Sequence, residues 1–140
     1  MTSKLTFTGN GIFQIKWPGL SGIKDFSNDT LAFYGNDTVK LDSHYYLVKR
    51  LILRTNRTCT FNAGDSLGIS YYITGDWNGA TLNSNSPGSY YYLTIPSTVG
   101  TGVRGMQISD CYNYGIPMTV NMGADRGHNY GITYVKKNIW

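Results

Sequence analysis

The sequence predicts an all-β fold, and three observations support this prediction. Helix-favouring residues are scarce, since the chain has no Glu, four Ala and two Gln. Strand and turn formers are abundant, with 15 Thr, 12 Asn, 12 Tyr and 17 Gly. Apolar residues also recur at every second position in short segments bounded by Gly, Pro, Asn or Asp. We therefore expect an antiparallel β-sandwich, jelly-roll-like, with about nine to eleven short strands.

Four strands are expected in the first 42 residues, because apolar side chains share one face in each of four segments. Gly35 to Asp37 separates the last two segments and is typical of a hairpin connection. Residues 18–29 read as a loop. The residues that share faces are Leu5 with Phe7, Phe13 with Ile15 and Trp17, Leu31 with Phe33, and Val39 with Leu41.

Residues 44–54 fit two interpretations. Asp42 or Ser43 could cap a helix, with Leu47 and Leu51 at helical spacing, yet the same residues also alternate as a strand would. We favour the strand. Two further strands follow, joined by Ala63 to Asp65.

The second half of the chain contains four more short apolar segments, in residues 90–96, 103–109, 116–122 and 130–135. Their spacing of roughly ten residues favours a sandwich over a parallel α/β sheet, which would need helical segments between the strands. No repeat period and no linker emerge. Residues 1–140 are therefore expected to form one domain.

Charge and cysteine content exclude several classes of protein. The formal net charge is +4 and no basic run exceeds two residues, so nucleic-acid binding is not expected. The longest apolar runs are far shorter than the roughly 20 residues that span a bilayer, and no signal-peptide pattern is present, so we expect no membrane insertion. Cys59 and Cys111 lack a CxxC partner pattern, which argues against zinc. Buried thiols are favoured over a disulfide, and both alternatives stay open.

No recognised catalytic motif is present. The chain lacks a GxSxG elbow, a phosphate-binding loop and a dinucleotide fingerprint. Its eight acidic residues are all Asp and lie mainly in turn contexts. We therefore expect no enzymatic activity, no catalytic residue and no cofactor or metal site, with calcium bound by loop oxygens of Asp and Asn as an open alternative.

The first candidate binding site is aromatic. Trp77 lies between Asp76 and Asn78, so a ring that can stack on a sugar has hydrogen-bonding neighbours within three residues. In a strand, Tyr90 and Tyr92 share the more polar face while Tyr91 shares the apolar one. The sequence thus predicts an aromatic platform of Trp77, Tyr90 and Tyr92, with Tyr91 in the core.

The second candidate site is a polar loop near the C-terminus. It places Asp125, Arg126, His128 and Asn129 within five positions and could present both donors and acceptors to a ligand. A solvated turn without a ligand is the alternative interpretation.

The functional prediction is a receptor-binding or adhesion module that recognises cell-surface carbohydrate or a host receptor, as in a phage fibre tip or a bacterial adhesin. The low-charge, Gly- and Asn-rich composition also suits a structural subunit of a virion, fibre or pilus, whose outward aromatics are buried by self-assembly. A glycan-active enzyme is the second alternative. A homotrimer is the first expectation, located outside the cell or on a virion or cell surface.

Overall fold

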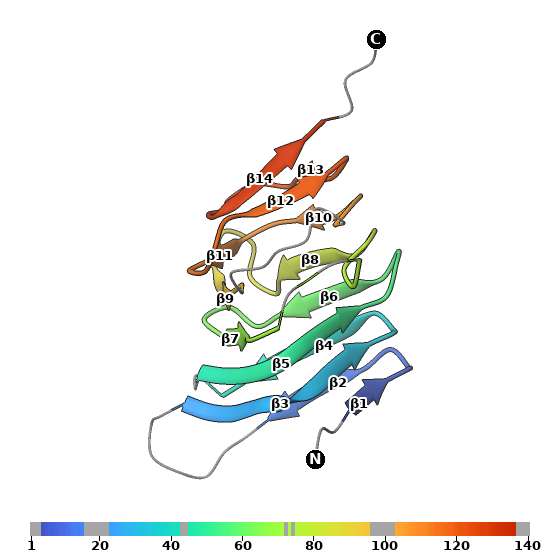
Figure 1. Cartoon of the computed structure of the whole chain (residues 1–140), viewed down its shortest axis with the longest axis vertical. Coiled ribbons are helices and arrows are strands. Elements are labelled where there is room, and N and C mark those ends of the chain that lie inside the picture. The colour runs from blue at the N-terminus through green and yellow to red at the C-terminus, as the bar shows by residue number, and fades with distance from the viewer. Residues whose placement is uncertain are drawn as a thin grey trace.

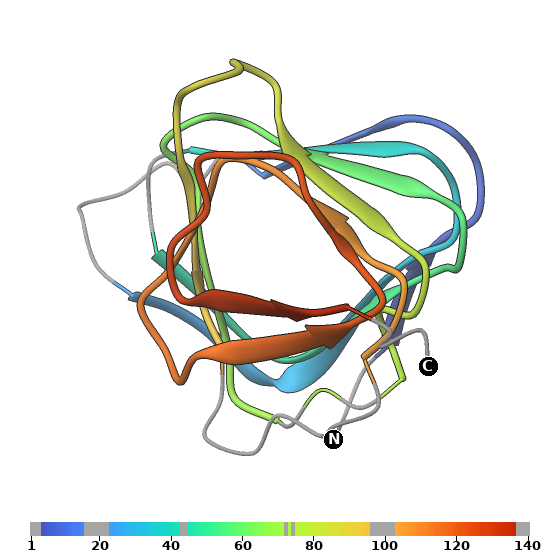
Figure 2. The same ribbon diagram turned by 90° about the horizontal axis from the view of Figure 1, so that it is seen from above.

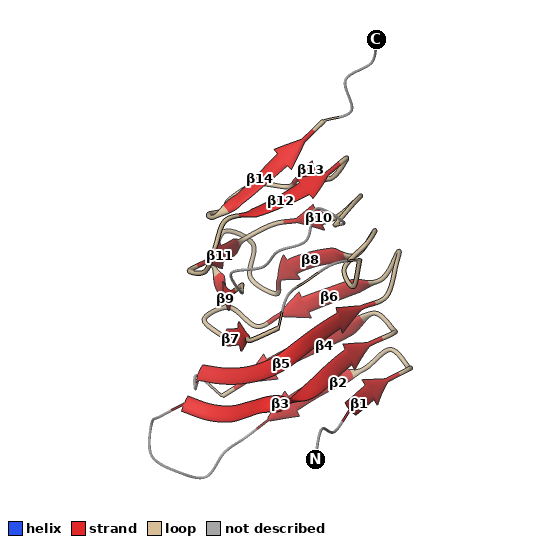
Figure 3. Cartoon of the chain, in the orientation of Figure 1, coloured by secondary structure: helices blue, strands red, loops and turns tan. Residues whose placement is uncertain are grey.

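The strands of the chain are parallel and wind into a β-solenoid (Figure 1), in a computed structural model that describes residues 4–15, 23–42, 45–71, 73, 75–95 and 103–136. The described part of the chain contains no helix (Figure 3). The strands are β1 (Lys4–Phe7), β2 (Ile12–Ile15), β3 (Ile23–Phe33), β4 (Asp37–Leu41), β5 (Tyr45–Leu53), β6 (Thr58–Phe61), β7 (Ser66–Ile69), β8 (Thr81–Ser84), β9 (Tyr91–Thr94), β10 (Gln107–Ile108), β11 (Cys111–Asn113), β12 (Met118–Asn121), β13 (Ala124–Asp125) and β14 (Ile132–Val135).

Three sheets form the sides of the solenoid. Sheet 1 has the order β1-β3-β5-β7-β9-β11, and sheet 2 has the order β13-β10-β8-β6-β4-β2. Strands β12 and β14 pair as a third sheet. Seen along its axis, the chain winds around a roughly triangular outline (Figure 2). Each strand therefore pairs with the strand one coil further along the chain.

The predicted antiparallel sandwich is wrong, and so is the jelly-roll topology. Residues 35–37 connect β3 in sheet 1 to β4 in sheet 2, so they form a corner of the coil and no hairpin. Side chains alternate with period two in parallel and antiparallel strands alike, so the apolar pattern does not distinguish the two. The described chain has 14 strands because each coil is divided into short strands at its corners.

The coils differ in length, which explains why the sequence shows no repeat. Thr81 pairs with Gln107 one coil later, an offset of 26 residues. Gln107 pairs with Ala124, 17 residues later, and β12 pairs with β14 at an offset of 14. The solenoid accordingly narrows towards its C-terminal end, where the last turns are smaller than the first (Figure 2).

Alternate residues of each strand face a shared core. Residues Tyr45–Leu53 form one continuous strand, β5, which confirms the strand prediction for these residues. Within β9, Tyr91 and Leu93 are buried, and the alternate residues Tyr92 and Thr94 are only partly buried. Tyr91 stacks on Phe61 of β6 with ring centroids 4.8 Å apart, so the inner faces of sheets 1 and 2 meet directly.

Both cysteines are free and buried, as the sequence analysis favoured. Burial raises the pKa of Cys111 to about 12 and raises that of Cys59 further. They therefore act as small apolar side chains in the core.

Asparagine side chains hold the corners of successive coils together. Asn10 Oδ1 accepts the backbone N–H of Asn36 at 2.9 Å, and Asn36 Oδ1 accepts that of Thr58 at 2.9 Å. One side further on, Asn85 Nδ2 donates to Asn62 Oδ1 at 2.7 Å. The high Asn content thus satisfies corner backbone groups that no strand partner reaches.

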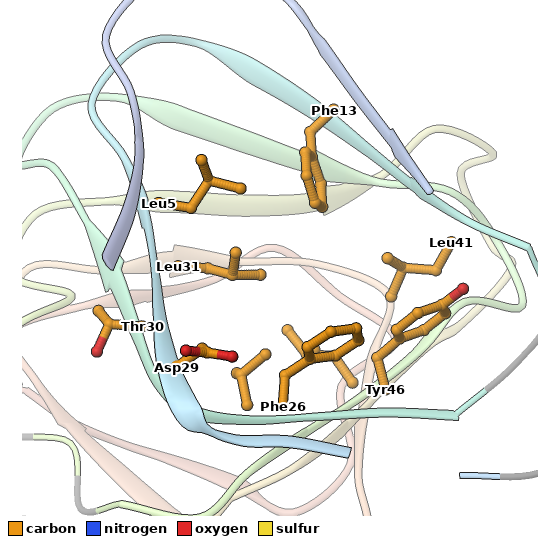
Figure 4. A pocket seen from close by; sticks show the side chains of 10 residues that line it. Leu5, Phe13, Phe26, Asp29, Thr30, Leu31, Leu41 and Tyr46 are labelled. Atoms are coloured by element: carbon orange, nitrogen blue, oxygen red, sulfur yellow. The ribbon is translucent and has the colours of Figure 1, made fainter. Parts of the chain in front are cut away.

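The N-terminal end of the core is incompletely covered. A cavity of about 440 Å³ opens there between the first coils, and its wall includes Leu5, Phe13, Phe26 and Tyr46 (Figure 4). Leu5 remains 51% exposed. Strand β3 begins within the predicted loop 18–29, and a register shift between Phe26 and Thr30 bends it beside this cavity.

Among the residues that the structure describes, Trp77 is the largest fully buried side chain, and it connects the turn before β8 to β5. Its indole N–H donates to the carbonyl of Leu51 at 2.8 Å, and the ring has 0% exposure. Truncating such a residue removes its packing and leaves a buried carbonyl without a partner.

We expect Trp77→Ala to lower the free energy of unfolding by about 3–5 kcal/mol, measured by urea denaturation. Trp77→Phe should cost less, because it keeps most of the apolar contact. As a control, Ile116→Ala removes a side chain that is 48% exposed and should stay within about 0.5 kcal/mol of the wild type. A fully stable Trp77→Ala protein would show that this ring is not part of the core.

Asp65 is a buried carboxylate whose titration should be visible in the stability of the protein. It is 2% exposed, and its Oδ2 accepts the N–H of Leu41 at 2.6 Å. Burial raises its pKa from 3.8 to about 6, although that hydrogen bond opposes the shift. The folded protein therefore binds this proton more tightly than the unfolded chain, and the stability contributed by protonation is lost as the pH rises from about 4 to about 6.

We therefore compare the stability of Asp65→Asn with that of the wild type at two pH values. The difference should favour the variant more at pH 7 than at pH 4, because Asn retains an acceptor and carries no charge. Thermal denaturation of both proteins at the two pH values measures this difference. An identical difference at both pH values would mean that Asp65 has an unshifted pKa.

Candidate ligand-binding surface

Five tyrosines form a continuous row of rings on the outer face of the C-terminal half of sheet 1. We call this row the tyrosine ladder: Tyr90, Tyr92, Tyr112, Tyr114 and Tyr130. Tyr112 is at its centre, with ring centroids 4.4 Å from Tyr130, 4.6 Å from Tyr114, 5.5 Å from Tyr90 and 6.0 Å from Tyr92. Tyr92 and Tyr114 also stack at 5.6 Å.

Parallel register produces the ladder from residues far apart in the chain. Tyr92 of β9 pairs with Tyr112 of β11, and Tyr112 forms a bridge to Tyr130 in the next coil. Because strands lie roughly 4.8 Å apart, in-register rings on one face are brought into stacking distance. Three coils thus contribute to one aromatic surface.

The ladder is open to solvent at its edge. Tyr114 is 65% exposed and Tyr130 is 56% exposed, whereas the other three rings are partly covered by their neighbours. Desolvation by these neighbours raises the pKa of Tyr112, and the nearby phenols add to the effect. The ring faces that stack on a neighbour, as between Tyr112 and Tyr130, are covered, and the surface open to solvent comes mainly from Tyr114 and Tyr130.

The structure brings together only part of the predicted aromatic platform. Tyr90 and Tyr92 lie side by side on the outer face with centroids 6.4 Å apart. Tyr91 is buried, as predicted. Trp77 does not join them, because the turn before β8 folds it into the core and the length of β8 lies between it and Tyr90 along the chain.

The two neighbours of Trp77 have structural contacts at that turn. Asp76 holds Arg50 in a two-pronged ion pair, with Nε–Oδ2 and Nη2–Oδ1 distances of 2.6 Å. Asn78 Oδ1 accepts the N–H of Arg104 at 2.9 Å and so links two coils. Neither side chain lies in the tyrosine ladder.

The predicted polar loop lies at the corner that leads from sheet 2 to sheet 1. Asp125 Oδ1 accepts from Gly127 N at 2.9 Å and from Asn129 Nδ2 at 2.7 Å, which closes the turn. Asn129 Oδ1 in turn accepts the N–H of Cys111 at 3.1 Å. These two residues shape the corner, whereas Arg126 and His128 are exposed on it.

Arg126 and His128 line a polar cleft of about 540 Å³, which we call the corner cleft. Its other walls come from earlier corners and strand ends, including Asn83, Gly88, Ser109 and Asp110. Asp110 and His128 both have a left-handed backbone, with φ values of 57° and 51°. This backbone conformation is uncommon for residues other than glycine, and it occurs where a corner must turn sharply.

The corner cleft adjoins the tyrosine ladder along the chain in three successive coils. Gly88, Asp110 and His128 each line the cleft and each stand two positions before a ladder tyrosine. Sequence reasoning found Tyr90 and Tyr92 but assigned no ligand role to Tyr112, Tyr114, Tyr130, Asn83 or Asp110. The repeated Tyr-x-Tyr pattern at 90–92 and 112–114 was the available signal, and it becomes meaningful only when the two segments are known to be in register.

The surface offers no metal centre within the residues that the structure describes, since no three His, Cys, Asp or Glu side chains come together there. In the same residues, no helix is long and apolar enough to cross a membrane. Comparison with known proteins gives no match: no family model fits the chain, and no curated protein or solved structure is significantly similar to it.

The central position of Tyr112 predicts its contribution to stability. Tyr112→Ala removes four ring contacts and should lower the free energy of unfolding by about 2–4 kcal/mol in urea denaturation, since an aromatic pair contributes roughly 0.5–1 kcal/mol. Tyr130→Ala, which removes the contact with Tyr112 at the edge of the ladder, should cost less. Equal effects of the two variants would contradict the geometry described for Tyr112.

Proposed function

We propose that this protein is a non-enzymatic receptor-binding or adhesion module that recognises carbohydrate through the tyrosine ladder. The observation that carries the proposal is the row of five outward tyrosines in mutual contact on one flat sheet face. A cell-surface glycan is the partner that this chemistry suits best.

Tyrosine rings on a rigid sheet suit sugar binding for a physical reason. The C–H-rich face of a pyranose stacks on an aromatic ring, and the phenol hydroxyl can donate to or accept from a sugar hydroxyl. The ladder rings are attached to paired strands and pack on one another, so little side-chain entropy remains to be lost on binding.

The shape of the ladder favours an extended chain of sugars over a single residue. Tyr92, Tyr112 and Tyr130 succeed one another from coil to coil, so the stacking positions run along the solenoid axis. A linear glycan laid along this axis would contact the solvent-facing edges and hydroxyl groups of several rings at once, and several weak contacts would add up to one useful affinity.

A second candidate function is assembly with further copies of the chain, as in a fibre or virion subunit. The same exposed rings favour it, together with Ile116 and Met122, which are 48% and 47% exposed near the C-terminal end. In that arrangement, the ladder would be covered by a neighbouring subunit and would not meet sugar. A trimer is the first expectation.

Glycan-array binding by the wild type and by Tyr114→Ala and Tyr112→Ala tests the carbohydrate proposal. We expect each variant to bind its best glycan about fivefold more weakly, because each lost stack contributes on the order of 1 kcal/mol. Tyr71→Ala is the matched control, since Tyr71 is also exposed, at 38%, but lies beside Lys49 and away from the ladder.

Two outcomes would contradict the proposal. Unchanged glycan binding by both ladder variants, with all proteins folded by circular dichroism, would remove the ladder from recognition. A stable oligomer in light scattering that dissociates on Tyr114→Ala, without glycan binding by the wild type, would instead support assembly.

A further inference from the structure

The polar groups of the corner cleft suit a site that binds hydroxyl groups. We propose that it is the specificity subsite of the tyrosine ladder and that it takes a neutral hexose unit, which it recognises by accepting hydrogen bonds from sugar hydroxyls. This inference rests on the proposed carbohydrate function and adds the substrate class and the residues that select it.

The cleft and the ladder are close enough to act on one glycan. Asp110 precedes Tyr112 by two positions, and His128 precedes Tyr130 by two. Two residues of chain span at most about 7 Å, so each cleft residue lies next to its tyrosine. A glycan stacked on the ladder would therefore place a neighbouring sugar unit at the cleft.

The loop that covers the cleft is held in place before any ligand arrives. Asp110 Oδ1 accepts the N–H of Gly88 at 2.9 Å, which fastens the 85–89 corner over the two following coils. The Asp110 N–H donates to the carbonyl of Gly127 at 3.0 Å. The walls of the cleft are thus connected through one buried residue, which is 6% exposed.

The cleft contains more acceptors than its own donors satisfy. Asn83 lines the cleft, and its Oδ1 is buried without a hydrogen-bond partner among the described residues. Asp110 Oδ1 receives Gly88 N and lies 3.3 Å from His128 Nδ1, while Oδ2 receives no bond from the described residues. Unsatisfied acceptors of this kind favour a ligand that brings O–H donors.

The charges of the cleft give an acidic sugar no net attraction, because the lining has one carboxylate, Asp110, and one guanidinium, Arg126. Arg126 donates through Nε and Nη2 to Gln107 Oε1, at 2.9 and 2.6 Å, so part of its donor capacity is used within the protein. A ligand carboxylate brings no donor for the acceptors of the cleft, and the charge of Asp110 offsets the attraction of the Arg126 guanidinium for it. Neutral hexoses supply several hydroxyls and carry no charge, so they match both conditions.

Two variants test the assignment by calorimetric titration with soluble neutral polysaccharides, a glucan, a mannan and a galactan, and with polygalacturonate and hyaluronan as acidic probes. Asn83→Ala removes the unsatisfied acceptor and no hydrogen bond shown for the side chain, so it should fold normally. Asp110→Asn retains an oxygen for Gly88 N but replaces the other acceptor with a donor. The matched control is Thr60→Ala, because Thr60 pairs with Asn83 in the adjacent strand and does not line the cleft.

We expect the wild type to bind at least one neutral polymer and neither acidic one. Both cleft variants should bind that polymer about tenfold more weakly with unchanged melting temperature, while Thr60→Ala binds as the wild type does. Full affinity in both cleft variants, or a preference of the wild type for the acidic polymers, would overturn the subsite assignment.

The outcomes also separate this inference from the proposed function. If Tyr112→Ala weakens binding and Asn83→Ala and Asp110→Asn do not, the ladder stands and the subsite fails. If the cleft variants lose binding and the ladder variants retain it, the proposed function of the ladder fails, and the cleft binds neutral hexose by itself and not as a subsite of the ladder. Absence of binding to every neutral and acidic polymer overturns both.

Discussion

In-register pairing between successive coils is the constraint on which the rest of this structure depends. Because each strand pairs in parallel with the strand one coil later, every side chain has a counterpart directly above or below it on the same face. Inward, this register brings Phe61 and Tyr91 together across the core. Outward, it aligns Tyr92, Tyr112 and Tyr130, and at the corners it lets Asn10 and Asn36 satisfy the backbone of the next coil.

The sequence predicts the strands and their buried faces well because both depend on local alternation. Tyr91 is in the core and Tyr90 and Tyr92 are outside it, and residues 45–53 form a strand, all as the pattern indicates. The direction of pairing is a different kind of property, because it depends on which distant segment each strand meets. Gly35 to Asp37 would suit a hairpin as well as it suits a corner. The sequence offset between paired strands varies between 26 and 14 residues, and this variation conceals the repeat that would have identified a solenoid.

The candidate site was predictable only in part for the same reason. Tyr90 and Tyr92 follow from alternation, but Tyr112 and Tyr130 join them through register between coils, which no local pattern specifies. Trp77 misleads in the opposite direction. Its polar neighbours suggest an exposed loop, yet Asp76 is occupied by Arg50 and Asn78 by the backbone of Arg104, so the turn can fold the indole inward.

In the proposed carbohydrate site, the tyrosine ladder on sheet 1 and the corner cleft have different roles. Under the proposed carbohydrate function, a row of tyrosines offers aromatic contact that every pyranose can accept, so we expect it to contribute affinity with little discrimination. Corners are where the chain departs from strand geometry, as the left-handed backbone of Asp110 and His128 shows, and there polar atoms can converge from three coils. Asp110 joins the two, since it fastens the loop that contains Gly88 and stands two residues before Tyr112. We therefore expect a change at this one residue to alter the proposed specificity subsite while leaving the tyrosine ladder in place.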